Sequence, residues 1–174
     1  MLTLEDLEPG DVLAYYVDED FLAFLGIELA QALVIGRRST YVHVAVWEGS
    51  GELTAYTNTG VALGGKYPFK CAVLRPMTPE WELKKGLAWA RGRIGKTTYG
   101  WMSYLWIYIL RKLGVRRVLE WPEDSFICSS FVAKFLEHAG VHAFPLMFAS
   151  EIIPEDFTSA IGLVNLGDLD HVSI

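Results

Sequence analysis

The sequence predicts an α+β fold, because segments typical of strands fill most of its first half and segments typical of helices most of its second half. Residues 41–47 (YVHVAVW) are β-branched and aromatic, as buried strands usually are. After residue 78 the apolar residues recur at helical spacing instead, as at Leu83, Leu87 and Ala90. The 174 residues suit one hydrophobic core, so we expect a single domain over residues 1–174.

In the first half, the Pro9-Gly10 turn predicts a strand over residues 11–17. Asp18 and Asp20 are suited to begin a helix that covers the apolar residues 21–36. Residues 41–47 form the next expected strand, and the turn at residues 49–51 predicts a hairpin with a returning strand over residues 52–57. A further strand is expected over residues 70–75.

In the second half, Thr78 is the expected N-cap of a helix that continues toward Gly92. A polar loop over residues 94–99 leads to an aromatic helix that begins at Trp101. Residues 122–125 introduce a helix that has Cys128 in its first turn and Gly140 just past its end. A short last strand is expected near residues 162–166.

Two apolar segments, residues 21–36 and 101–110, are too short or too polar for membrane spans, which need about 20 apolar residues. Both fit buried helices better. The N-terminus lacks the pattern of a secretory signal, so we expect a cytoplasmic protein. The formal net charge of −6 gives no general attraction to phosphate backbones or anionic lipid, and it makes nucleic acid an unexpected partner.

Cys128 and His43 are the strongest candidates for chemistry. A thiol at a helix N-terminus near an imidazole can have its pKa lowered from about 8.5 to roughly 3.5–7.5, which makes it a nucleophile. Catalytic Cys and His partners meet in space rather than in sequence, so we expect the side chains of His43 and Cys128 to lie within hydrogen-bond reach. The alternative is structural, because Val132 and Phe135 share the apolar stripe of Cys128 and suggest a small core residue.

Several motifs together resemble the NlpC-type cysteine peptidases of the papain-like superfamily. Residues 94–101 (IGKTTYGW) and 126–132 (FICSSFV) are similar to its tyrosine and cysteine motifs. Residues 9–12 (PGDV) and 43–47 (HVAVW) are similar to its first strand and its histidine strand. Because His43 precedes Cys128, the order resembles the circularly permuted branch with YiiX-like proteins and the lecithin:retinol acyltransferase-like group. Residues 73–76 (VLRP) and 153–157 (IPEDF) also resemble the YiiX-like branch.

The resemblance implies a papain-like domain in which an antiparallel sheet packs on helices. It also implies Cys128 as nucleophile, His43 as base, and Tyr99 as a possible oxyanion donor, although Tyr99 also suits a buried aromatic role. Family members place a polar residue on the strand after the histidine strand, and the aligned residue here is Thr54. A threonine can orient an imidazole but cannot balance its charge. Asn58 is the alternative orienter, and Thr54 also suits a plain strand position.

Other candidate residues suit structural roles better. Cys71 fits a buried thiol within a strand, and His171 fits a solvated terminus. His138 and His142 lie on either side of Gly140, so a shared helical face for a metal is not expected. No motif for a cofactor or metal is found, and we expect none.

The leading hypothesis is a cysteine hydrolase that cleaves an amide bond in a peptide or cell-wall muropeptide through an acyl-enzyme at Cys128. One alternative is a lipid-directed acyltransferase or thioesterase of the same fold, which would add an acylated small molecule and peripheral lipid contact to the partners. The other alternative is a non-catalytic binding domain, which the threonine at position 54 suggests. The sequence does not determine the oligomeric state.

Overall fold

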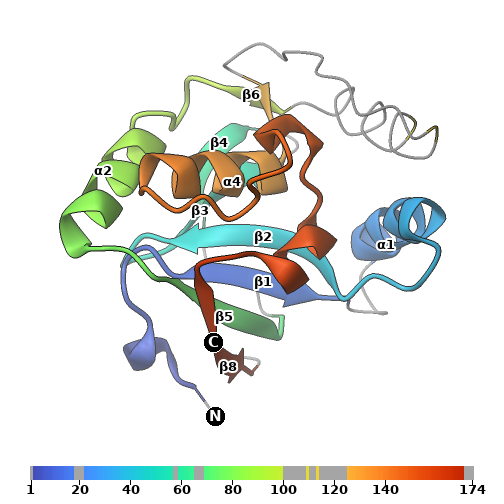
Figure 1. Ribbon diagram of the computed structural model, residues 1–174, viewed down its shortest axis with the longest axis horizontal. Helices are drawn as coiled ribbons and strands as arrows, with labels where there is room; N and C mark the ends of the chain where they lie inside the picture. Colours follow the sequence, from blue (N-terminus) through green and yellow to red (C-terminus); the bar gives the residue numbers. More distant parts are fainter. Residues whose placement is uncertain are drawn as a thin grey trace.

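The protein is described by a computed structural model over residues 2–17, 22–56, 59–64, 69–99, 109, 113 and 125–170 (Figure 1). Three helices are described: α1 (Leu22–Ile35), α2 (Glu80–Arg91) and α4 (Cys128–His138). The strands are β1 (Val12–Tyr16), β2 (Tyr41–Trp47), β3 (Glu52–Tyr56), β4 (Gly60–Gly64), β5 (Cys71–Pro76), β6 (Thr98–Tyr99), β7 (Ser125–Phe126) and β8 (Leu163–Leu169). Short 3₁₀ helices are η1 (Leu4–Asp6), η2 (Ala149–Glu151) and η3 (Pro154–Ser159).

A six-stranded antiparallel sheet of order β4-β3-β2-β1-β5-β8 forms the centre of the molecule. The α+β class is therefore confirmed. Helices α2 and α4 lie over one face of this sheet, and α1 lies beside one end of it (Figure 1). The strands β6 and β7 form a separate parallel pair.

Each face of the sheet has its own apolar cluster, because side chains alternate between the faces along every strand. On the face toward the helices, Val44 and Val46 of β2 pack with Phe131 and Phe135 of α4. The opposite face holds a smaller cluster, whose buried members are Leu7, Leu13, Tyr15, Ala45, Trp47, Cys71, Val73 and Leu169. This division decides which side chains can meet Cys128, since α4 contributes only to the first cluster.

Most expected elements are found within a residue or two. Strands β4 and β6 were not expected, and four of the expected features differ from the structure. Thr78 does not cap α2: Pro79 is the N-cap, and the Thr78 hydroxyl donates to the Ala139 carbonyl at 2.8 Å. The segment after residue 124 begins with strand β7, and the helix starts only at Cys128. The last strand runs on to Leu169 because it pairs with all of β5.

The fourth difference concerns α1, which is not buried on all sides as its sequence suggested. Its polar Gln31 is buried, whereas Leu29 and Leu33 are exposed. The expected aromatic helix from Trp101 lies outside the described residues, apart from Ile109. Within the described ranges, no helix combines the length and apolar character that crossing a bilayer requires.

Candidate active site

Cys128 is the first residue of α4, directly after the N-cap Ile127. The Phe131 amide donates the first helical hydrogen bond, to the Ile127 carbonyl at 3.0 Å. The amides of the first turn before it therefore have no carbonyl acceptor inside the helix. The Ser130 hydroxyl accepts from the Ile127 amide at 3.0 Å and holds the start of the helix in place.

Three backbone amides favour the thiolate of Cys128. Two of them, from Cys128 itself and Ser129, belong to the first turn of α4, and the third belongs to Val44 of β2. Amides that point at a sulfur stabilise its negative charge and lower the pKa of the thiol. The structure therefore gives Cys128 an anion-stabilising environment and places its sulfur against the strand that contains His43.

Burial opposes these amides and outweighs them. Cys128 is only 6% exposed, and its burial raises the pKa of the thiol to about 11. The sequence suggested a lowered pKa from the helix N-terminus and a nearby imidazole, and the structure differs because a charged sulfur is costly in a site with little water. In this conformation the thiol is protonated at neutral pH.

The Val44 amide is available to Cys128 because the ladder between β2 and β3 is short. This ladder pairs Val46 with Leu53 and Trp47 with Glu52. Val44 lies beyond it, and its carbonyl instead accepts the Thr54 hydroxyl at 2.8 Å. Thr54 thus completes the hydrogen bonds of the strand at the point where Cys128 approaches it.

His43 lies on the face of the sheet that α4 does not cover. It pairs across the strands with Tyr15, whose ring centroid is 5.7 Å from that of the imidazole. Cross-strand partners share a face, and Tyr15 belongs to the cluster on the far face. Burial lowers the pKa of His43 to about 4, so the imidazole is neutral at physiological pH.

Cys128 therefore approaches the backbone next to His43, but the two side chains are not hydrogen-bonded to each other. The sulfur of Cys128 faces the amide of Val44, the residue immediately after His43. Among the described residues, no hydrogen bond joins the His43 side chain to Cys128 or to Thr54. The expectation of a direct imidazole–thiol contact is not met here, because His43, like its cross-strand partner Tyr15, faces away from the helix layer.

The two remaining sequence candidates are only partly within the described structure. The backbone of Tyr99 pairs with Phe126, two residues before Cys128, which brings the tyrosine motif beside the cysteine motif. The Tyr99 side chain and all of Asn58 lie outside the described residues. Their proposed roles at the site stay predictions.

One segment that the sequence did not single out for the site joins its two halves. The Ser129 hydroxyl donates to the Ile152 carbonyl at 2.6 Å, next to Cys128. Three residues later the buried Glu155 carboxylate accepts from the Ser39 hydroxyl and from the amides of Thr40 and Tyr41, at the start of β2. Residues 152–155 therefore tie the cysteine helix to the histidine strand. The only sequence signal was the IPEDF motif.

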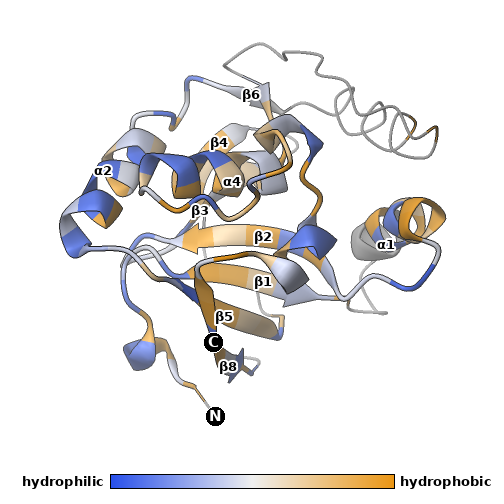
Figure 2. Cartoon of the chain, viewed as in Figure 1, coloured by the Kyte–Doolittle hydropathy of each residue, from blue (hydrophilic) through white to orange (hydrophobic). Residues whose placement is uncertain are grey.

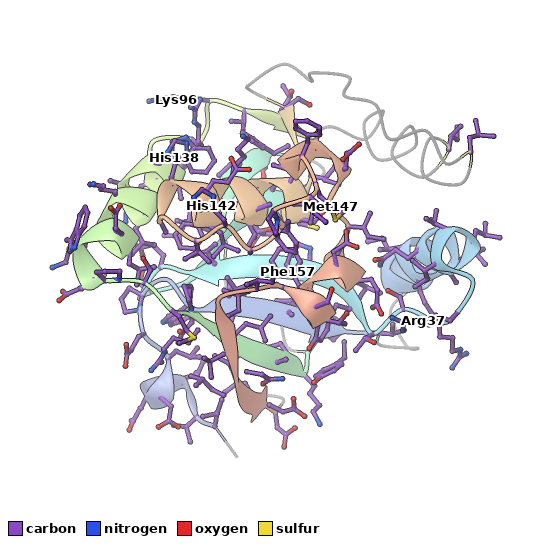
Figure 3. All side chains as sticks on the ribbon, in the orientation of Figure 1. Arg37, Lys96, His138, His142, Met147 and Phe157 are labelled. Atoms are coloured by element: carbon purple, nitrogen blue, oxygen red, sulfur yellow. The ribbon has the colours of Figure 1, made fainter. Side chains whose placement is uncertain are left out.

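The other candidate residues lie in surroundings that fit structural roles. Burial, with the charges of Glu52 and Asp168, raises the pKa of Cys71 to about 12. The His138 ring stacks on Trp89 with centroids 4.6 Å apart. His142 and Glu137 line a cavity of about 280 Å³ beside α4, which Met147 also lines (Figure 3). The described residues contain no group of side chains suited to a metal, and His171 lies outside them.

Comparison with models of protein families and with curated proteins gives no match for this chain.

Proposed function

We propose that the protein is a cysteine hydrolase that cleaves an amide bond in a peptide or muropeptide, with Cys128 as nucleophile. The observation that supports this most is that three backbone amides favour the thiolate of a sulfur at a helix N-terminus. A structural core thiol has no need of such groups, and Cys71, with its higher pKa, shows the contrast. The papain-like, circularly permuted NlpC-type fold is part of the same proposal and rests on the sequence motifs.

The chemistry starts from a neutral thiol and a neutral imidazole. His43 takes the proton from the sulfur as the sulfur attacks the amide carbonyl carbon. The imidazolium then gives this proton to the leaving nitrogen, the C–N bond breaks, and an acyl-enzyme remains on Cys128. Water hydrolyses the thioester and restores the thiol. In this proposal the Cys128 amide stabilises the carbonyl oxygen as it becomes negative.

This mechanism requires His43 to reach the sulfur past the β2 backbone. The ladder between β2 and β3 does not extend to His43, so the described pairing of this part of β2 is with β1. Substrate binding would supply the interaction that favours the rearranged imidazole, since a ligand shifts a conformational equilibrium only by its preference for one state. A neutral His43 is in the correct protonation state to act as a base.

The second candidate is acyl transfer or thioester cleavage on a lipid, with the same nucleophile and base. It is favoured by the exposed leucines of α1, since α1 packs against Ile127 beside Cys128. The acyl-enzyme is common to both candidates. They differ in the group that leaves and in the acceptor that follows.

Turnover assays separate these candidates. The purified protein is incubated with a set of dipeptide amides and muropeptides and with fatty-acyl thioesters, and the products are measured by mass spectrometry. We expect amide cleavage that Cys128→Ser abolishes and that the matched variant Cys71→Ser leaves within about twofold. Cleavage of acyl thioesters alone would favour the lipid candidate, and equal activity of wild type and Cys128→Ser would refute both.

A further inference from the structure

Helix α1 differs from an ordinary surface helix, because it buries two polar side chains and exposes two leucines. Its inward side holds Gln31, whose amide group donates to the Tyr41 carbonyl at 2.9 Å and accepts from the Glu155 amide at 3.0 Å. Glu28 is also buried and pairs with Arg38. Its outward side holds Leu29 and Leu33, which are 64% and 59% exposed.

The inward side of α1 is nevertheless firmly packed. Ala30, Val34 and Ile35 contact Ile127 and Ile153, which places the helix directly beside the start of α4. The hydrogen bonds of Gln31 fix the rotation of α1 about its axis, because turning the leucines inward would leave the Tyr41 carbonyl and the Glu155 amide without these partners. The outward leucines are thus a fixed feature of the fold.

Two arginines follow the apolar face of α1. The side chains of Arg37 and Arg38 are 61% and 81% exposed, whereas their carboxylate partners Glu155 and Glu28 are 4% and 12% exposed. Figure 3 shows Arg37 at the end of α1. Figure 2 shows that the described part of α1 carries more apolar colouring than α2 does. At this surface the positive groups are outermost and the negative groups are covered.

We propose that the outer face of α1 docks on a membrane surface that contains anionic phospholipid. An interfacial helix buries leucines at the boundary between headgroups and acyl chains, and its arginines meet anionic headgroups from the adjacent polar edge. Leu29 and Leu33 are one helical turn apart and supply the apolar contact. Arg37 and Arg38 present exposed guanidinium groups to the headgroups, while their carboxylate partners Glu155 and Glu28 lie beneath them. This docking would bring the N-terminus of α4, with Cys128, close to the lipid.

The net charge of −6 does not oppose this contact strongly, because charges more than about 10 Å away are screened at physiological salt. A patch of two leucines and two arginines is small, so the binding is reversible and dependent on salt. It requires no catalysis, and its failure would leave the proposed hydrolase untouched.

Co-sedimentation with vesicles tests the docking surface. The full chain is mixed with vesicles of phosphatidylcholine containing 30 mol% phosphatidylglycerol, and with vesicles of phosphatidylcholine alone. We expect binding to the mixed vesicles, severalfold weaker binding to neutral ones, and severalfold weakening in 0.5 M NaCl. The double variant Leu29→Ser/Leu33→Ser should bind at least tenfold more weakly.

Leu146→Ser is the matched control, because Leu146 is an exposed leucine on the loop after α4. It should bind within twofold of wild type, and circular dichroism should show that all variants remain folded. No binding to mixed vesicles, or equal binding of wild type and the double variant, would overturn the proposal. A wild-type dimer that the double variant dissociates, seen by light scattering without vesicle binding, would assign the face to a second copy of the chain instead.

Discussion

At the scale of single residues, the candidate site is a balance between burial and backbone amides at one sulfur. The amides of Val44, Cys128 and Ser129 favour the thiolate, and the loss of water around Cys128 opposes it more strongly. The same burial keeps His43 neutral on the other face of the sheet. The resting protein therefore holds a thiol and an imidazole, not an ion pair.

The alkylation rate of Cys128 should reflect this raised pKa. With iodoacetamide and the Cys71→Ser variant, we expect the rate to rise about tenfold per pH unit from pH 6 to 10 without a plateau, because only the thiolate reacts. Cys128 should react faster than Cys71 does in Cys128→Ser, since Cys71 has the higher pKa. A plateau below pH 8 would show that an imidazole already shares the proton.

His43 should make the protein less stable in acid. Its pKa is lowered from 6.5 to about 4 in the folded state, so between these values the unfolded chain binds the proton more strongly. The stability that neutral His43 contributes is present above pH 6.5 and decreases as the pH falls toward 4, by about 3 kcal/mol at most. Urea unfolding at several pH values measures this. His43→Gln should weaken the dependence of the unfolding free energy on pH. The same dependence in the variant and in wild type would contradict the burial of the imidazole.

Thr54 should matter for the strand more than for the chemistry. Thr54→Val removes the donor to the buried Val44 carbonyl and should lower the free energy of unfolding by about 1 to 3 kcal/mol. Thr54→Ser keeps the hydroxyl and should lose less. Thr54→Ala should reduce kcat/KM less than His43→Ala does, and comparable losses would show that Thr54 acts on the imidazole directly.

At the scale of elements, residues 152–155 connect the parts that carry the candidate chemistry. The Ile152 carbonyl accepts a hydrogen bond from the Ser129 hydroxyl. The Glu155 carboxylate accepts hydrogen bonds from the amides of Thr40 and Tyr41 and forms an ion pair with the Arg37 guanidinium at 2.7 Å. This link spans more than a hundred residues of sequence. No local pattern predicts it, because buried polar networks depend on tertiary placement.

Glu155→Gln tests this link. The variant keeps one acceptor oxygen but leaves the Arg37 charge without its partner and puts an amide donor among other donors, so we expect a loss of about 3 kcal/mol in the free energy of unfolding. Glu80→Gln is the matched control, since its pair with Lys84 is exposed, and it should change stability by less than about 0.5 kcal/mol. Equal effects in chemical denaturation would mean that the network adds little.

The sequence predicted the elements whose signals are local. The run YVHVAVW predicted β2 with the bounds that the structure has. Gly140, with φ of +72°, follows the end of α4 as the expected C′ residue. Strand β4 was not predicted, because Gly60 and Gly64 are unfavourable in a strand. The strand forms because it pairs with β3. The orientation of α1 was not predicted either, because it depends on hydrogen bonds of Gln31 to Tyr41 and to the distant Glu155.

At the scale of the whole molecule, the order of the sheet decides how the site is assembled. Strand β2 lies between β1 and β3, so α4 can place Cys128 against it from one face while Tyr15 packs on His43 from the other. The sequence predicted that the side chains of His43 and Cys128 lie within hydrogen-bond reach, whereas the structure brings the sulfur of Cys128 to the amide of Val44. The sequence could not predict on which face His43 lies, because every residue of β2 is buried and no alternation of polarity marks one side.

The central claim is that Cys128 is the nucleophile of a hydrolase, and mapping a covalent adduct tests it most directly. The intact protein is treated with an activated acyl probe that mimics an amide substrate, and the labelled peptide is identified by mass spectrometry. We predict a single thioester adduct on Cys128 that hydrolyses with time in wild type and persists longer in His43→Ala. An adduct on Cys71, or equal and permanent labelling of both thiols, would contradict the claim.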